Sequence, residues 1–290
     1  MRDYVIVTDS TSDIPDDMAN ELNIKVVPMS FTIGDKTYNH YPDYRELDIK
    51  TFYDKLRSGQ TSLTAQINAA VYVDFFEQII KSGMDILYIS FSSALSSTYQ
   101  SSVTASKEMM DKYPDFNIIS IDSKSAALGE TLLVYEASKK KQEGMNIKEL
   151  AKWVEDNHLK VCHFFTVDDL NHLKRGGRLT AISAFIGTAL DIKPILHVND
   201  EGKLIPIEKI RGRKKALKVL FNYLSDLGED IESQTIFIGH GDCIEEAKYL
   251  EVLIREAFNV KHVIIHPIGP IIGSHTGPGS ILLFFFGKHR

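Results

Sequence analysis

The sequence predicts an α/β protein with two domains. In the N-terminal part, short apolar segments alternate with segments whose apolar residues recur at helical spacing. In the C-terminal part, two apolar segments flank Asn199-Asp200-Glu201-Gly202, which indicates an antiparallel hairpin. The chain has 290 residues, of which 43% are hydrophobic and 25% charged, so it can form one large core or two medium ones.

Strands are predicted in the first half where short apolar runs occur, at Tyr4–Thr8, Lys25–Met29, Ile86–Ser90 and Asn117–Ile121. Helices are predicted between and after them, at Asp16–Leu22, Ile49–Leu56, Tyr72–Ile80, Ser97–Met110, Ala126–Lys141 and Ile147–Asn157. This alternation indicates a mostly parallel sheet with helices on both faces. Ligands of such sheets usually bind at the carboxyl ends of the strands.

The second half follows a different pattern. Strands are predicted at Val161–Val167, Ile192–Val198, Leu204–Ile210, Thr235–Gly239, His262–His266 and Ile281–Phe286, and helices at Lys214–Leu227 and Glu245–Phe258. A polar, basic loop is expected after the first of these strands. We therefore predict an N-terminal α/β domain over residues 1–158 and a C-terminal α+β domain with antiparallel pairing over residues 159–290.

Composition and charge disfavour several classes of partner and location. Lys and Arg number 33 against 39 Asp and Glu, a formal net charge of −6, which disfavours nucleic acid as a partner. Cys162 and Cys243 form no CxxC pair and no zinc framework, so no metal is expected, and they are typical of buried thiols in a reducing cytosol. The apolar run Tyr4–Val7 is too short for a signal peptide, and no run approaches the ~20 residues of a membrane span. A cytoplasmic location is expected.

Two hydroxyl-rich segments follow predicted strands. Asp9-Ser10-Thr11-Ser12-Asp13 could supply an aspartyl nucleophile and a second acid, but a polar turn that caps the helix near Pro15 is the favoured interpretation. A ligand-proximal loop is a further alternative. Ser90–Tyr99 holds five serines and a threonine at the start of a helix. A capping residue alone would need one hydroxyl, so this segment favours an oxyanion site at the helix N-terminus.

Two other segments are weaker signals. Gln60–Asn68 is polar and precedes an apolar helix, so we interpret it as the start of that helix. His266–Gly279 contains four glycines and three prolines, which predicts a rigid, irregular loop. A histidine there could donate to an anion or act as a general base, although a structural role is the more common one.

Basic residues cluster at Lys174-Arg175-Gly176-Gly177-Arg178 and at Arg211-Gly212-Arg213-Lys214-Lys215. Such clusters usually form a solvated face, and phosphate contact or docking of an acidic partner are the alternatives. The sequence holds no GxxxxGK[ST], no GxGxxG after a strand, no HExxH and no GxSxG. Four common enzyme classes therefore lack their usual motif.

Seven short motifs together resemble the DegV family over essentially the whole chain. In order they are Val7-Thr8-Asp9-Ser10-Thr11, Thr64-Ala65-Gln66, Ser92-Ser93-Ala94-Leu95-Ser96-Ser97-Thr98-Tyr99, Asp122-Ser123, Leu173-Lys174-Arg175-Gly176-Gly177-Arg178, Lys193-Pro194-Ile195 and His275-Thr276-Gly277-Pro278-Gly279. The resemblance implies a non-catalytic, two-domain bacterial protein that binds a long-chain fatty acid such as palmitate. Some family members present the acyl carboxylate to a separate, ATP-binding fatty acid kinase subunit.

The resemblance also implies site residues. The family's T-S-Q-P-S pattern places the carboxylate-binding threonine at Thr64, and its S-S-x-L-S-G-T pattern places the serine at Ser96, with Ser93 as second choice. The histidine of H-x-G-P-G is His275, with His266 as the alternative, and Ser97 and Ser10 are secondary candidates. The chain departs from the family at Ser97, which replaces a glycine, and at Ala65 and Ile67, which replace serine and proline.

A dry lipid tunnel between the domains follows from this resemblance, because a long alkyl chain needs apolar walls. Candidate wall residues are Phe164, Phe165, Phe185, Ile186, Ile271 and Ile272, and candidate partner or phosphate contacts are Arg175, Arg178, Arg211 and Arg213. A phosphotransferase or hydrolase that uses Asp9, Asp13 or His275 is one rival hypothesis. A regulatory interaction module with a structural lipid is another. Transient membrane contact is also expected of a lipid carrier.

Overall fold

The computed structural model describes residues 2–178 and 191–290. Sheet A has the strand order β2-β1-β6-β7 and is parallel throughout, with β1 Tyr4–Asp9, β2 Lys25–Val27, β6 Asp85–Ser90 and β7 Ile118–Asp122. Sheet C has the order β10-β9-β8-β13-β11-β12, in which only the β11–β12 pair is parallel. Its strands are β8 Val161–Thr166, β9 Ile192–Val198, β10 Leu204–Arg211, β11 Thr235–His240, β12 His262–Pro267 and β13 Ile281–Phe286. The predicted fold class is confirmed.

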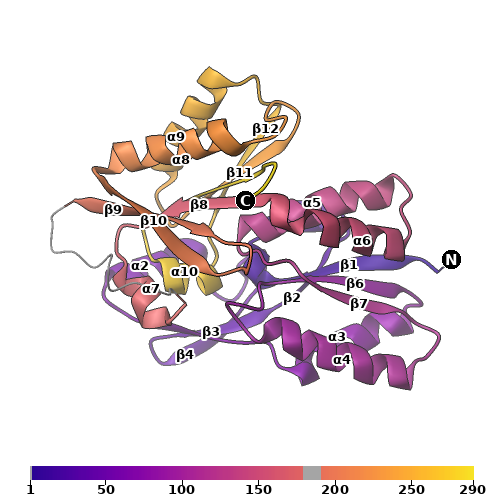
Figure 1. Cartoon of the computed structure of the whole chain (residues 1–290). Helices are drawn as coiled ribbons and strands as arrows, with labels where there is room; N and C mark the ends of the chain where they lie inside the picture. The colour runs from indigo at the N-terminus through magenta and orange to yellow at the C-terminus, as the bar shows by residue number, and fades with distance from the viewer. Residues whose placement is uncertain (1, 179–190) are drawn as a thin grey trace.

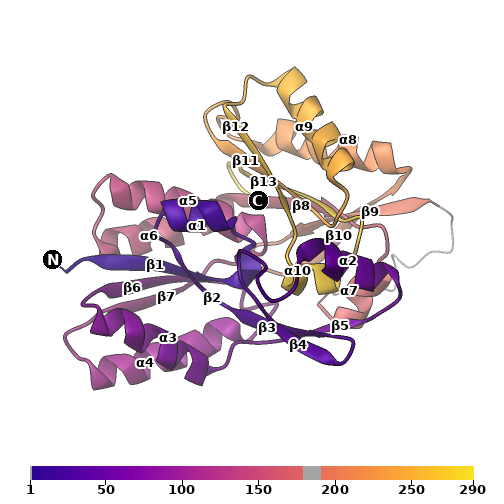
Figure 2. The same ribbon diagram turned by 180° about the vertical axis from the view of Figure 1, so that it is seen from behind.

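Helices and sheets alternate in layers (Figures 1 and 2). Helices α3 and α4 cover one face of sheet A, and α5 and α6 cover the other, while α8 and α9 cover the outer face of sheet C. The bounds of these helices are α3 Ala69–Lys81, α4 Thr98–Lys112, α5 Leu128–Gln142, α6 Ile147–Asn157, α8 Arg213–Leu227 and α9 Ile244–Ala257. Three separate apolar cores lie between the layers.

Helix α5 is the layer that the two large sheets share. It contacts β1 and β6 on one side and β8, β11 and β13 on the other. Its first three turns are almost wholly buried, which matches their many apolar residues, since a helix that is apolar all round is one that packs on all sides. The first half of the chain thus contributes to the core under sheet C. The domain boundary near residue 158 stays a prediction.

A third, small sheet was not predicted. Strands β4 Lys36–His40, β3 Met29–Ile33 and β5 Ser62–Ala65 form it in that order, all antiparallel. The predicted single strand Lys25–Met29 is divided at Pro28, which has no N–H for a sheet hydrogen bond, and the chain passes from sheet A into this sheet. The segment Gln60–Asn68 is predicted as the start of a helix, and its last residue, Asn68, does cap α3. Its middle part, Ser62–Ala65, is instead a strand that pairs Thr64 with Phe31.

Two segments predicted as loops contain short helices. Helix α7 Asn171–Gly176 lies in the basic segment after β8, and α10 Pro270–Thr276 lies in the glycine- and proline-rich segment before β13. Proline at the first helical position suits α10, because the N–H that proline lacks has no partner within a helix. The remaining helices are α1 Asp16–Glu21 and α2 Ile49–Arg57, with 3-10 turns at Ser10–Ser12 and His158–Lys160. None of the helices in the described residues is long and apolar enough to cross a bilayer.

Candidate functional site

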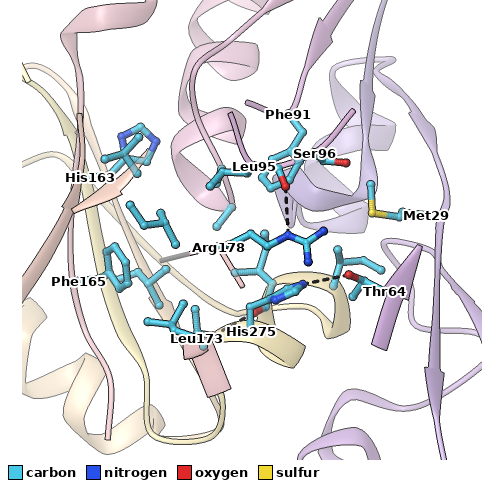
Figure 3. A pocket seen from close by; sticks show the side chains of 18 of the residues that line it. Met29, Thr64, Phe91, Leu95, Ser96, His163, Phe165, Leu173, Arg178 and His275 are labelled. Atoms are coloured by element: carbon cyan, nitrogen blue, oxygen red, sulfur yellow. Dashed lines mark hydrogen bonds between the residues drawn. The ribbon is translucent and has the colours of Figure 1, made fainter. Parts of the chain in front are cut away.

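A cavity lies where the three sheets meet (Figure 3). Its wall is formed by β3, β5, β8, β9, β10 and β13, by α7 and α10, and by the segments that follow β6 and β7. Most lining residues are apolar: Met29, Phe91, Leu95, Ala126, Ala127, Phe165, Leu173, Val198, Leu204, Ile271, Ile272, Leu282 and Phe284. The polar ones are Thr64, Gln66, Ser96, His163, Arg178, His275 and Thr276. The cavity is therefore mainly apolar.

The parallel sheet positions one side of this cavity. Phe91 to Ser96 follow β6, and Ala126 and Ala127 follow β7, so both segments leave the carboxyl ends of neighbouring strands. The opposite side comes from sheet C, where Phe165 of β8 and Leu282 of β13 are direct cross-strand partners. Side chains alternate between the faces of a strand, so these two residues point toward α5 and the cavity.

Four of the polar lining residues gather on one side (Figure 3). The Thr64 Oγ1 atom of β5 lies 2.9 Å from Nε2 of His275 on α10, although 211 residues separate them in the sequence. The Ser96 hydroxyl pairs with the Thr98 hydroxyl at 2.9 Å, and it accepts a bond from the Thr98 amide. Arg178 Nε donates to the Leu95 carbonyl oxygen at 3.3 Å. We call Thr64, Ser96, Arg178 and His275 the polar corner.

Burial controls the charge in the polar corner. Burial, together with the smaller effect of the nearby Arg178 guanidinium, lowers the pKa of His275 to about 4. His275 is therefore neutral at physiological pH and carries one N–H. Its second nitrogen, Nδ1, is buried without a hydrogen-bond partner among the described residues. Positive charge in the corner thus comes from Arg178.

Four other predicted site residues lie outside the cavity. Ser93 is exposed and accepts a bond from Lys124 Nζ at 3.1 Å. Ser97 is exposed at the start of α4, and its side chain makes no capping bond. His266 lies on β12 and stacks on Tyr44. Ser10 is buried, but its hydroxyl accepts from the Met29 amide at 2.9 Å rather than lining the cavity.

The four arginines predicted to contact a partner or a phosphate lie in different environments. Arg178 lines the cavity, Arg175 is exposed on α7, and Arg211 is exposed at the end of β10. Arg213 does not fit the predicted partner contact. Its side chain is only 15% exposed, it pairs with Glu246 and Asp168, and it donates to the Gly279 carbonyl oxygen. Its charge is already used to hold three segments of the chain together.

The acidic turn has a structural role. Asp9 is fully buried and accepts four hydrogen bonds, from the Thr11 amide and hydroxyl, the Tyr88 hydroxyl and the Phe91 amide. It caps the 3-10 turn Ser10–Ser12 rather than the helix near Pro15, where no side-chain cap is present. Asp13 ends that turn and accepts from the Gly269 amide at 3.0 Å. Neither carboxylate lines the cavity, so neither faces a bound molecule there as a nucleophile would.

The candidate wall residues also divide. Phe165, Ile271 and Ile272 line the cavity. Phe164 points to the other face of sheet C, where its ring stacks on Tyr223 with centroids 4.1 Å apart. Phe185 and Ile186 lie outside the described residues.

Sequence reasoning missed further wall residues. These include Met29, Phe91, Leu95, His163, Leu282 and Phe284. Side chains along the strand Ile281–Phe286 alternate between its two faces, so Leu282 and Phe284 share one face. The sequence does not say which face points inward, because all six residues are apolar.

Within residues 2–178 and 191–290, no group of three or more His, Cys, Asp or Glu side chains lies close enough together to hold a metal ion.

A family model described as an uncharacterised protein of the DegV family matches residues 3–288. The chain belongs to the DegV family. Its resemblance to this family is thereby confirmed.

Relatives of this DegV chain match it over nearly their full length. A DegV domain-containing protein of Clostridium perfringens is 47% identical over 290 residues, which cover 100% of this chain and 99% of that protein. Among solved structures, a DegV lipid-binding protein from Thermotoga maritima matches with a TM-score of 0.88 and 27% identity, over 99% of each chain. DegV from Bacillus subtilis, described as a fatty acid binding protein, matches with a TM-score of 0.84 and 29% identity, over 99% of this chain and 100% of that one.

Proposed function

We propose that this DegV protein binds a long-chain fatty acid in the cavity, with the alkyl chain along the apolar walls and the carboxylate in the polar corner. The observation that carries the proposal is the cavity itself, an apolar chamber whose hydroxyl and guanidinium groups gather on one side. The similarity to DegV proteins described as lipid-binding and fatty acid binding supports the same ligand class.

Energetics favour a lipid over a small polar ligand. Burial of about 14 methylenes at ~0.8 kcal/mol each contributes on the order of 11 kcal/mol before the costs of association. An unpaired carboxylate in the same apolar space would cancel much of that gain. A fatty acid therefore needs both the apolar wall and a set of donors at one end.

The pairing of Thr64 with His275 can supply such a donor. A neutral His275 with its proton on Nε2 donates to Thr64 Oγ1, which leaves the threonine hydroxyl proton free for a carboxylate oxygen. The hydroxyl of Ser96 and the guanidinium of Arg178 line the same corner. Hydrogen bonds to a charged carboxylate are about twice as strong as neutral ones.

Presentation to a kinase is the second part of the proposal. Thr64, Arg178 and His275 also line a surface pocket, together with His172 and Arg175 of α7. These three residues thus line both pockets. A carboxylate held there is reachable by a separate ATP-binding subunit, and the basic side chains suit a transferred phosphate group.

Organic extraction of the purified protein, followed by mass spectrometry, tests lipid binding directly. We expect about one fatty acid per chain, and a higher melting temperature after palmitate is added to lipid-free protein. Absence of a lipid together with an unchanged melting temperature would refute the proposal. Acyl phosphate formed from ATP only when a fatty acid kinase subunit is present would support presentation.

Lipid exchange distinguishes a carrier from a regulatory module with a structural lipid. A carrier must release its ligand, so labelled palmitate should exchange with unlabelled palmitate in vesicles on the time scale of the kinase reaction. Vesicles also test for transient membrane contact. A lipid that stays bound throughout would favour the regulatory module.

A further inference from the structure

We infer that Thr98 is a positioning residue, which makes the Ser96 hydroxyl a pure hydrogen-bond donor toward the ligand and so favours a carboxylate head group over a neutral amide. This inference rests on the proposed function. Thr98 is the first residue of α4 and is not among the residues that line the cavity, so it acts on the ligand through Ser96.

Thr98 joins the two segments that carry the hydroxyls of the polar corner. Its side chain is fully buried, and its Oγ1 atom lies 2.9 Å from Oγ of Ser96 in the turn after β6. The same Oγ1 atom accepts a hydrogen bond from the amide of Ile67 at 3.4 Å. Ile67 follows β5, the strand of Thr64, so one hydroxyl connects the end of β5 with the turn after β6.

The hydrogen bonds of Thr98 fix the direction of its proton. The Ile67 amide can only donate, so Thr98 accepts that bond and keeps its own proton. Among the described residues, Ser96 Oγ is the acceptor that Thr98 Oγ1 contacts. If Ser96 donated to Thr98 instead, the Thr98 proton would be buried without an acceptor, which costs free energy. Thr98 is therefore the donor and Ser96 the acceptor.

Ser96 then has both of its lone pairs occupied. It accepts from the Thr98 hydroxyl and also from the Thr98 amide, at 3.3 Å. A hydroxyl has two lone pairs and one proton, so the capacity that remains to Ser96 is the proton. Ser96 lines the cavity, and its proton is the one that a ligand there can receive (Figure 3).

This arrangement distinguishes between head groups of similar size. A carboxylate offers only acceptors, so it matches a Ser96 hydroxyl that can only donate. The NH₂ group of a primary amide offers only donors, and it finds no free lone pair on Ser96. Removal of the Thr98 hydroxyl would free one lone pair, so that Ser96 could accept from such an amide.

Affinities for palmitate and palmitamide, measured by displacement of a fluorescent fatty acid, test the inference. Thr98→Val keeps the shape of the side chain and removes its hydroxyl. It should weaken palmitate binding about three- to tenfold, because the bond that Ser96 donates is no longer oriented and strengthened by one that it accepts. The preference for palmitate over palmitamide should fall by at least the same factor. Thr98→Ser keeps the hydroxyl and should restore both values.

Two further variants separate positioning from a loss of stability. Ser102→Ala is the matched control, because Ser102 is also fully buried on α4 but donates to the Tyr99 carbonyl oxygen at 2.7 Å within the helix. It should lower the melting temperature and leave both affinities unchanged. In a Ser96→Ala background, Thr98→Val should have no further effect on palmitate binding, since residues that act as one unit are not additive.

Two results would overturn the inference. One is a Thr98→Val protein with the palmitate affinity and head-group preference of the wild-type protein. The other is a Thr98→Val effect that persists in full in the Ser96→Ala background. If the valine variant does not fold, Thr98→Ala removes the same hydroxyl and is held to the same criteria. Failure of the wild-type protein to bind palmitate would instead overturn the proposed function, and this inference with it.

Discussion

The proton on Glu130 gives a prediction that can be worked from individual hydrogen bonds. The Thr11 hydroxyl lies 2.5 Å from Asp9 Oδ1 and 3.1 Å from Glu130 Oε2, and the Thr8 hydroxyl lies 2.7 Å from Glu130 Oε1 and 3.0 Å from the Ile89 carbonyl oxygen. Each hydroxyl has one proton for two acceptors. Asp9 also accepts from two backbone amides, which favours its ionised form. Of the two carboxyl groups, Glu130 is therefore the one that carries a proton.

The direction of the pH effect follows from that proton. Burial raises the pKa of Glu130 well above its ordinary value, and the charge of Asp9 raises it further. Between the ordinary glutamate pKa of ~4.3 and the raised one, the folded state holds a proton that the unfolded state has lost. The contribution of Glu130 to the free energy of unfolding is therefore largest at the acidic end of that range, and it declines as pH rises through the range. One proton corresponds to about 1.4 kcal/mol per pH unit.

Glu130→Gln isolates this contribution, because the amide has the same shape and cannot ionise. Melting temperatures of both proteins should be measured from mildly acidic to mildly alkaline pH. For a chain of 290 residues, whose unfolding entropy is roughly 0.6 kcal/mol/K, we expect the wild-type protein to lose about 2 °C per pH unit more than the variant. Asp9 and Asp13 also have pKa values raised by burial, so the variant will keep some pH dependence. Parallel curves for the two proteins would refute the assignment of the proton.

Three further outcomes are expected. Thr64→Val and Ser96→Ala should each weaken fatty acid binding by about 1.5–3 kcal/mol, measured by calorimetry, whereas Ser93→Ala, outside the cavity, should not change the Kd. Ala127→Gly should raise the free energy of unfolding by about 1 kcal/mol in a denaturant titration, because φ 52° and ψ −147° suit glycine rather than alanine. Arg290→Ala should lower the free energy of unfolding by about 2–3 kcal/mol, because the guanidinium donates to carbonyl groups of three separate segments. Arg290→Lys should lose less of this free energy than Arg290→Ala, but it should not match the wild-type protein.

The sequence predicted the elements whose stability is local or whose pattern is long. Apolar runs identified the strands of sheet A, and helical spacing identified α3 and α5 to within a few residues. The small antiparallel sheet escaped because β4 and β5 are short, polar and partly exposed. Strand β5 forms only through pairing across a long sequence separation, as between Phe31 and Thr64, whereas β4 pairs with β3 in a local hairpin. Helices α7 and α10 are too short to show a periodicity.

Site residues were predictable to the extent that motifs fix the backbone. Thr64, Ser96 and His275 line one cavity, and that they bind a carboxylate stays a prediction. Which of several adjacent hydroxyls faces inward depends on the course of the turn after β6, and so Ser93 could not be told from Ser96 by sequence. Arg213 illustrates the same limit for charge. Its carboxylate partners, Asp168 and Glu246, are brought to it by tertiary structure alone.

Charge distinguishes the two ends of the cavity. Arg178 lies beside His275, so that end suits an anion, whereas the wall formed by Phe165, Leu282 and Phe284 is apolar. A fatty acid bound in reverse would place its carboxylate among these apolar side chains and its methyl end beside Arg178. Both contacts are unfavourable, so the position of Arg178 fixes the direction of the ligand, with the carboxylate beside the residues that the two pockets share.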